Sequence, residues 1–214
     1  MEFNYIGDGI DALIIDNFYS EEQLSKIMDE LKFLTKKEIL IGPEHLGSAD
    51  GNATAKSGVF LETVYANWMH SGLIAYPMKN FNKPELRTKM LEFNSMYRIL
   101  FHCDTRSHLV SYYQDSNFYK PHVDMTVFTI LNYFHTEPKK FTGGDIKLFS
   151  STSSKQATIE VKQNRVVIIA GRTFHEVLPI FSEEGEEYTG NGRYCNSIFL
   201  TLRGGKPESK NDSN

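Results

Sequence analysis

The sequence contains Phe118-Tyr119-Lys120-Pro121-His122-Val123-Asp124, in which a histidine and an aspartate stand two residues apart. In a β-strand the side chains of residues i and i+2 point to the same face, so His122 and Asp124 can bind one ion while Val123 faces away. The segment is predicted to be a strand, because Pro121 is typical of a strand start or edge and residues 125–131 are rich in β-branched and apolar side chains. The pair therefore indicates part of a metal site on a strand.

A third ligand must come from elsewhere in the chain, and His175 is the best candidate. It lies between the apolar run at residues 166–170 and a second apolar stretch at 177–180, so a hairpin partner strand would bring it within reach. His135 is a rival, but residues 134–138 are typical of a loop. Two imidazoles and one carboxylate suit ferrous iron and leave coordination positions open. Zinc is the competing metal, although the sequence has no H-E-x-x-H helix.

The chain contains four stretches whose order along the sequence matches that of a known protein family. They lie at residues 111–124, 141–149, 174–179 and 192–194. Together they resemble the 2-oxoglutarate- and iron(II)-dependent dioxygenases, and within them the prolyl-4-hydroxylase-like branch. A fainter similarity at residues 12–18 extends the match to nearly the whole chain. The resemblance implies that Fe(II) is held by His122, Asp124 and His175. It also implies 2-oxoglutarate as co-substrate and O2, and it allows ascorbate.

The far carboxylate of 2-oxoglutarate needs a fixed cation, for which arginine supplies a planar two-point fork. The resemblance assigns this role to Arg193, on the strand expected after the one with His175; Cys195 and Ser197 should share its face. The segment between residues 180 and 192 is longer than usual in the family, so Arg203 is the fallback.

The resemblance also implies tyrosines that contact the co-substrate. Tyr113, nine residues before the first ligand, matches a family tyrosine, and Tyr112 has the opposite strand parity. A further family tyrosine corresponds to Asn132, or to Tyr133 if the register slips by one residue.

The organisation predicted from the sequence is one catalytic domain at residues 1–203. The 214 residues are 40% hydrophobic, enough to bury one core. A helix should follow Ser20 and a second should begin at Pro84, with helical support mainly within 1–105. Residues 106–203 should form the β core. The resemblance implies a mainly β fold, a double-stranded β-helix (jelly roll) supported by two to three α-helices. Residues 204–214 are expected to be a disordered tail, and residues 41–54 a long loop that could serve as a lid.

Composition narrows the cellular context and the partners. No apolar run approaches the length of a membrane span and the first residues lack a signal-peptide pattern, so we expect a cytoplasmic protein without membrane association. The formal charge of −4 argues against nonspecific nucleic-acid binding. Cys103 and Cys195 are the only cysteines in the sequence and are expected to be reduced.

The resemblance implies hydroxylation of a substrate with decarboxylation of 2-oxoglutarate to succinate and CO2. A prolyl residue of a protein or peptide is the best substrate, and a free amino acid or other small molecule is an alternative. An oxidative demethylase of nucleic-acid bases is a second alternative, but that class has an arginine six residues after the first, where this chain has Phe199. A noncatalytic jelly-roll binding module is the most distant one. Substrate specificity should lie in residues 40–80 and 181–192.

Overall fold

Seven antiparallel strands form the larger of two facing sheets. The computed structural model describes residues 1–36, 38–42, 46, 56–182 and 188–204. The strand order is β1 (Glu2–Ile6), β2 (Ala12–Asp16), β10 (Arg165–Ala170), β6 (Phe128–Phe134), β13 (Arg193–Leu202), β4 (Cys103–Tyr113) and β3 (Ser57–Phe60). Every residue of β6 is buried, because this central strand is covered on both faces.

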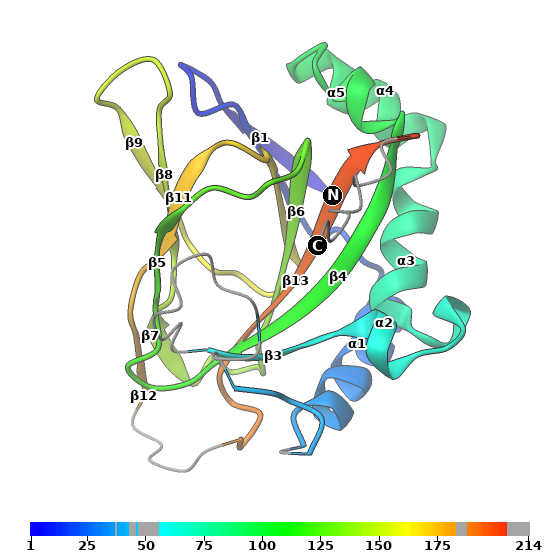
Figure 1. The fold of residues 1–214 in the computed structure, drawn as a ribbon, viewed down its shortest axis with the longest axis vertical. Helices are drawn as coiled ribbons and strands as arrows, with labels where there is room; N and C mark the ends of the chain where they lie inside the picture. The colour runs from blue at the N-terminus through cyan, green and yellow to red at the C-terminus, as the bar shows by residue number, and fades with distance from the viewer. Residues whose placement is uncertain (37, 43–45, 47–55, 183–187, 205–214) are drawn as a thin grey trace, which may run out of the picture.

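The smaller sheet has four strands, in the order β5 (Tyr119–His122), β11 (Phe174–Val177), β8 (Ile146–Phe149) and β9 (Gln156–Ile159). A short pair, β7 (Phe141–Gly143) and β12 (Ile180–Ser182), lies at one end. Figure 1 shows the two sheets facing each other across the molecule. Buried side chains of both sheets, including Leu131 and Val167 from one and Leu148 and Val177 from the other, form one core cluster. This is the jelly-roll arrangement that the sequence predicts.

Helices cover the outer face of the larger sheet (Figure 1). They are α1 (Glu21–Leu34), α2 (Leu61–Val64), the 3-10 turn η2 (Trp68–His70), α3 (Gly72–Phe81), α4 (Pro84–Phe93) and α5 (Tyr97–Leu100). Helix α1 begins as predicted, with a reciprocal capping box between Ser20 and Gln23. Its buried face contributes Ile27, Leu31 and Leu34 to a second core between helices and sheet. Among the described residues, no helix is long and apolar enough to cross a membrane.

Two expectations about the helical part were wrong. The structure has five α-helices within its described residues rather than two to three, although α2 and α5 are single turns. The helix predicted to begin at Pro84 does begin there, and it ends at Phe93 because Asn94 is extended and its Oδ1 accepts a hydrogen bond from the Met96 amide, which starts a new turn. Residues 57–80, expected to be part of a variable loop region, form β3, α2, η2 and most of α3. The predicted lid falls largely on residues 43–45 and 47–55, and the tail on 205–214, which lie outside the described residues.

Candidate active site

Two histidines face each other on adjacent strands of the smaller sheet. His122 is the last residue of β5, and His175, in β11, is its direct antiparallel partner. Asp124 completes a group of three possible ligands whose donor atoms all lie within 4.8 Å of one another. Its Oδ1 is 3.7 Å from His122 Nε2, and its Oδ2 is 3.9 Å from His175 Nε2. The structure thus brings together the three residues that the sequence pattern singled out.

Asp124 does not reach this position by strand parity, which corrects the prediction from sequence. Strand β5 ends at His122, and β6 begins at Phe128, so Asp124 lies in the connection. Its amide donates to the carbonyl oxygen of Gly171 at 2.8 Å. A Cβ at Gly171 would lie 2.1 Å from the Thr126 carbonyl oxygen, so glycine is needed for this close approach. Thr129 Oγ1 donates to Asp124 Oδ2 at 2.6 Å and fixes the carboxylate.

Hydrogen bonds set both imidazoles to present the same nitrogen. His122 Nδ1 donates to the Lys120 carbonyl oxygen at 2.9 Å, and His175 Nδ1 donates to that of Thr173 at 2.8 Å. Both Nε2 atoms therefore carry a lone pair directed at the carboxylate. Burial, followed by the nearby His175, lowers the pKa of His122 to about 4, which keeps this imidazole neutral at physiological pH. Two imidazoles and one carboxylate fit iron(II) and leave coordination positions free.

A cavity of about 620 Å³ opens from the triad into the space between the sheets. Arg193 lines it from β13 and is only 1% exposed, yet its Nε and Nη1 atoms have no hydrogen-bond partner among the described residues. The guanidinium lies over the rings of Tyr113 and Tyr133, at 4.6 and 4.9 Å from their centroids. Gly144 leaves room for it, because a Cβ there would lie 3.0 Å from Arg193 Cδ. A buried, unpaired arginine in a cavity is suited to binding a carboxylate.

The neighbouring strands settle which tyrosines face the cavity. Tyr113 is the direct partner of Arg193 across β4 and β13 and lines the cavity. Tyr112 lies on the opposite face, 4.8 Å from the Tyr194 ring. Of the two alternatives on β6, Tyr133 lies beside Arg193, whereas Asn132 accepts a hydrogen bond from the Tyr19 hydroxyl on the helix side.

The rival residues lie elsewhere. Arg203 is exposed and paired with Asp104 at 3.0 Å, and it is not among the described residues that line the cavity. His135 is buried on another part of the fold, where its Nδ1 donates to the Thr136 carbonyl oxygen. The sequence placed Arg193 on the strand directly after that of His175, but the three-residue β12 intervenes. Cys195 and Ser197 share the cavity with Arg193, as parity predicted.

Two residues of the site were missed by reasoning from sequence. Thr129 was read simply as part of a β-branched and apolar run, and a hydroxyl in that run is the one signal that could have drawn attention to it. Lys56 is 8% exposed and lines the cavity from the start of β3. No motif surrounds Lys56, so its position became visible only in the folded chain.

Comparisons with known proteins find one family model and several solved structures that this chain resembles. Residues 107–199 match the family model of the 2OG-Fe(II) oxygenase superfamily. A search of curated protein sequences finds no significant match to this chain. Among solved structures, a Pseudomonas putida prolyl-4-hydroxylase aligns with a TM-score of 0.59 at 14% identity, covering 90% of this chain and 93% of that one. A Trichoplax adhaerens prolyl hydroxylase, in complex with a hypoxia inducible factor oxygen degradation domain peptide fragment, aligns with a TM-score of 0.61 at 15% identity, covering 91% and 84%.

A third structure, an oxidoreductase of the 2OG-Fe(II) oxygenase family from Burkholderia pseudomallei, aligns with a TM-score of 0.58 at 14% identity, covering 89% of this chain and 84% of that one. At these identities the structural matches establish the fold, and the family model covers the residues of the triad and Arg193. The superfamily uses Fe(II), 2-oxoglutarate and O2, and the His-Asp-His group required for the metal is present. Residues 107–199 are therefore similar to the 2OG-Fe(II) oxygenase superfamily, and the chain has the same fold as the prolyl hydroxylases in this comparison.

Proposed function

We propose that the chain is a dioxygenase that hydroxylates a prolyl residue of a protein or peptide, with His122, Asp124 and His175 as iron ligands and Arg193 as the anchor of 2-oxoglutarate. The observation that carries the proposal is the buried Arg193 in the same cavity as the triad, whose Nε and Nη1 have no hydrogen-bond partner in the described part of the chain. Burying an unpaired cation costs several kcal/mol, so a fold that keeps one is suited to a bound anion. A dicarboxylate with one end at the metal and the other at Arg193 satisfies both groups.

The residues of the cavity bind the co-substrate, orient it and exclude water. When bound, iron(II) and 2-oxoglutarate supply the oxidation, in which one oxygen atom of O2 enters succinate as CO2 leaves and the other enters a C–H bond of the substrate. Arg193 fixes the far carboxylate, and the rings of Tyr113 and Tyr133 both contact the guanidinium and help to hold it in place. Apolar neighbours such as Leu131 keep water from the reacting centre.

The rim of the cavity supports a peptide as the substrate. Val123, Met125 and Phe174 line the opening and are exposed, with Met125 at 72%. Exposed apolar side chains gathered around a site are typical of a surface that another molecule covers. The Trichoplax adhaerens relative is named as a complex with a peptide fragment.

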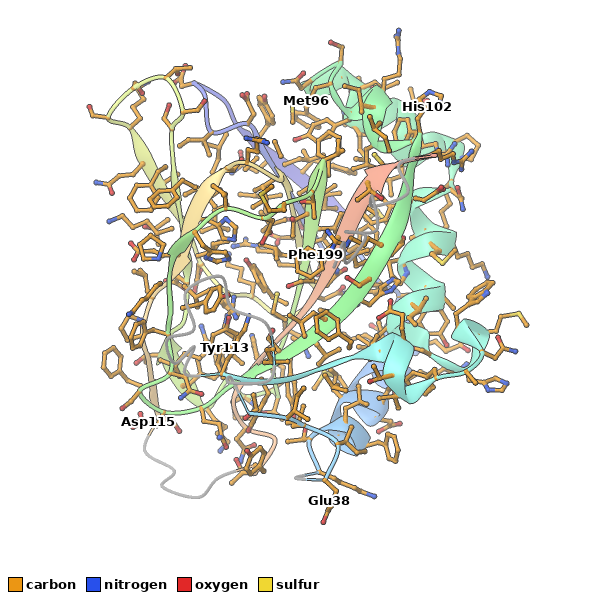
Figure 2. The ribbon with its side chains drawn as sticks, in the orientation of Figure 1. Glu38, Met96, His102, Tyr113, Asp115 and Phe199 are labelled. Carbon is orange, nitrogen blue, oxygen red and sulfur yellow. The ribbon has the colours of Figure 1, made fainter. Side chains whose placement is uncertain are left out.

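A nucleic-acid demethylase is less well supported, because Phe199 lines the cavity where that class has its second arginine. Figure 2 labels Phe199 and Tyr113, on the neighbouring long strands β13 and β4 of the larger sheet. A peptide therefore remains the better-supported substrate.

Anaerobic titration of the apoprotein with iron(II) and 2-oxoglutarate tests the proposal. We expect a weak visible charge-transfer band in the wild type, its loss in His175→Ala, and its retention in His102→Ala, which removes an exposed histidine distant from the triad. Release of CO2 from 2-oxoglutarate should then rise when prolyl peptides are added. A folded wild-type protein without the band would overturn the dioxygenase assignment; a band with no response to prolyl peptides would overturn the prolyl substrate alone.

A further inference from the structure

Lys56 is a second buried cation in the active-site cavity. Its ammonium nitrogen lies 4.1 Å from the centroid of the Tyr119 ring and 5.8 Å from that of Tyr113. Tyr119 in turn meets the imidazole of His122 edge-on, at 4.2 Å between ring centroids. Lys56 therefore lies one aromatic ring away from a metal ligand, on a wall that it shares with Tyr113.

The ammonium group has no anionic partner among the described residues. The ammonium group contacts the Tyr119 and Tyr113 rings through cation–π interactions, and these leave its hydrogen-bond donors free. Burial lowers the pKa of Lys56 to about 8, and the attraction of the Asp124 carboxylate offsets this only in part. At neutral pH the group is still mostly protonated and positively charged.

When iron(II) and 2-oxoglutarate are bound, no charge in the described part of the cavity balances the positive charge of Lys56. Asp124 is the only carboxylate among the described residues that line the cavity. Iron(II), Asp124, Arg193 and doubly negative 2-oxoglutarate together carry no net charge. Lys56 then adds one positive charge, and Arg106 and Lys120 add more at the exposed rim. A further anion is needed to complement the interior of the cavity.

We propose that Lys56 binds a carboxylate of the primary substrate, so that the molecule oxidised by this protein carries an acidic group close to the carbon that reacts. This inference rests on the proposed function and narrows its substrate class. Two sources share this chemistry: the side chain of an acidic residue next to proline in a peptide, and the α-carboxylate of a free amino acid such as proline. Lys56 is a specificity residue and takes no part in bond making.

Calorimetric binding to matched carboxylate and amide probes tests the proposal without turnover. The peptide pair is a blocked prolyl pentapeptide with Asp or Asn beside the proline, and the small pair is L-proline and L-prolinamide. Each is titrated into wild type, Lys56→Met, Lys56→Arg and Lys120→Met. The titrations use the zinc-loaded protein, with and without 2-oxoglutarate. Lys120→Met is the matched control, since it removes a lysine from the exposed rim of the same cavity.

We expect the wild type to prefer the carboxylate of one pair by at least tenfold, and the pair that shows the preference identifies the source. Lys56→Met should abolish the preference, Lys56→Arg should restore part of it, and Lys120→Met should retain it. Equal binding of carboxylate and amide by the wild type, or an unchanged preference in Lys56→Met, would overturn the proposal. So would a loss of 2-oxoglutarate affinity in Lys56→Met as large as that in Arg193→Met, because Lys56 would then bind the co-substrate.

Failure of the proposed function gives a different result. A wild-type protein that binds no 2-oxoglutarate contradicts the dioxygenase assignment. The carboxylate preference is also measured without the co-substrate, so the role of Lys56 is decided separately by the comparison of each carboxylate with its amide.

Discussion

Replacing Arg193 with methionine should separate co-substrate binding from folding. Methionine keeps much of the length and apolar surface of the arginine side chain but removes its charge and all its donors. In a two-point contact a carboxylate accepts parallel bonds from two donors of the guanidinium, either Nε and Nη2 or Nη1 and Nη2, and Arg193 Nε and Nη1 have no hydrogen-bond partner among the described residues. The variant thus loses contacts that exist only when the co-substrate is bound.

The size of the effect on 2-oxoglutarate affinity follows from the two hydrogen bonds of this contact. A hydrogen bond to a charged group contributes about 1.5–3 kcal/mol, so losing two costs about 3–6 kcal/mol of binding free energy. At about 1.4 kcal/mol per factor of ten, the dissociation constant of 2-oxoglutarate should rise roughly 10²- to 10⁴-fold. Arg193→Lys keeps the positive charge but not the planar pair of donors, and it should lose less affinity for 2-oxoglutarate than Arg193→Met.

Although Arg193→Met should weaken 2-oxoglutarate binding, it should not lower the free energy of unfolding. Arg193→Met removes the contacts with the Tyr113 and Tyr133 rings, worth about 0.5–2 kcal/mol each, but it also removes the desolvation cost of a buried ion, which is several kcal/mol. The apoprotein should therefore be as stable as the wild type or more stable.

Two measurements check this prediction. Anaerobic calorimetry with iron(II)-loaded protein gives the affinity for 2-oxoglutarate, and urea denaturation gives the stability of the apoprotein. Binding of 2-oxoglutarate by Arg193→Met within threefold of the wild-type affinity would refute the assignment of the anchor. A large loss of apoprotein stability would instead refute the view that Arg193 is an unsatisfied charge.

Three further perturbations give distinct results. Gly144→Ala places a Cβ 3.0 Å from Arg193 Cδ at a residue with φ of +73°, and should lower the free energy of unfolding by about 1–2 kcal/mol in chemical denaturation; unchanged stability would contradict the close approach. Thr129→Val removes the hydroxyl that holds Asp124 at 2.6 Å, and competition with a chelator should show about 10- to 100-fold weaker iron(II) binding; Thr129→Ser should retain most of the affinity. Burial and a neighbouring imidazole lower the pKa of His122 from 6.5 to about 4, so its contribution to apoprotein stability is complete above pH 6.5 and is lost as the pH falls toward 4. In urea denaturation across that range, the free energy of unfolding of His122→Gln should fall less steeply with decreasing pH than that of the wild type. Equal dependence on pH in the two proteins would contradict the shifted pKa.

Strand pairing explains why the histidines and Arg193 could be predicted from sequence. His122 and His175 stand in short segments whose apolar and β-branched neighbours favour strands, and two such strands can pair only in a few registers. Arg193 is at the start of a ten-residue strand with the same character. The position of Asp124 could not be predicted in this way, because its amide donates a hydrogen bond to Gly171, which lies 47 residues away in sequence.

Helix α3 could not be predicted because a distant side chain compensates for a local defect. Pro77 lies inside the helix and has no N–H to donate to the carbonyl of Leu73. Asn196, on β13, donates its Nδ2 to that carbonyl at 2.9 Å. The N-terminus is likewise held from outside, by Glu30 of α1, which accepts bonds from the Ser71 hydroxyl and the Leu73 amide. None of these partners is visible in the local sequence.

The two histidines of the triad and Arg193 belong to different sheets. His122 and His175 lie on the four-stranded sheet, whereas Arg193, Tyr113 and Tyr133 lie on the seven-stranded sheet. Asp124 connects the two halves, because it follows β5 and is held by Thr129 of β6. Substitution of Arg193 would leave the two histidines in place, and substitution of the histidines would leave the guanidinium in place. Descendants of this chain could lose catalysis by either route and keep a useful binding function.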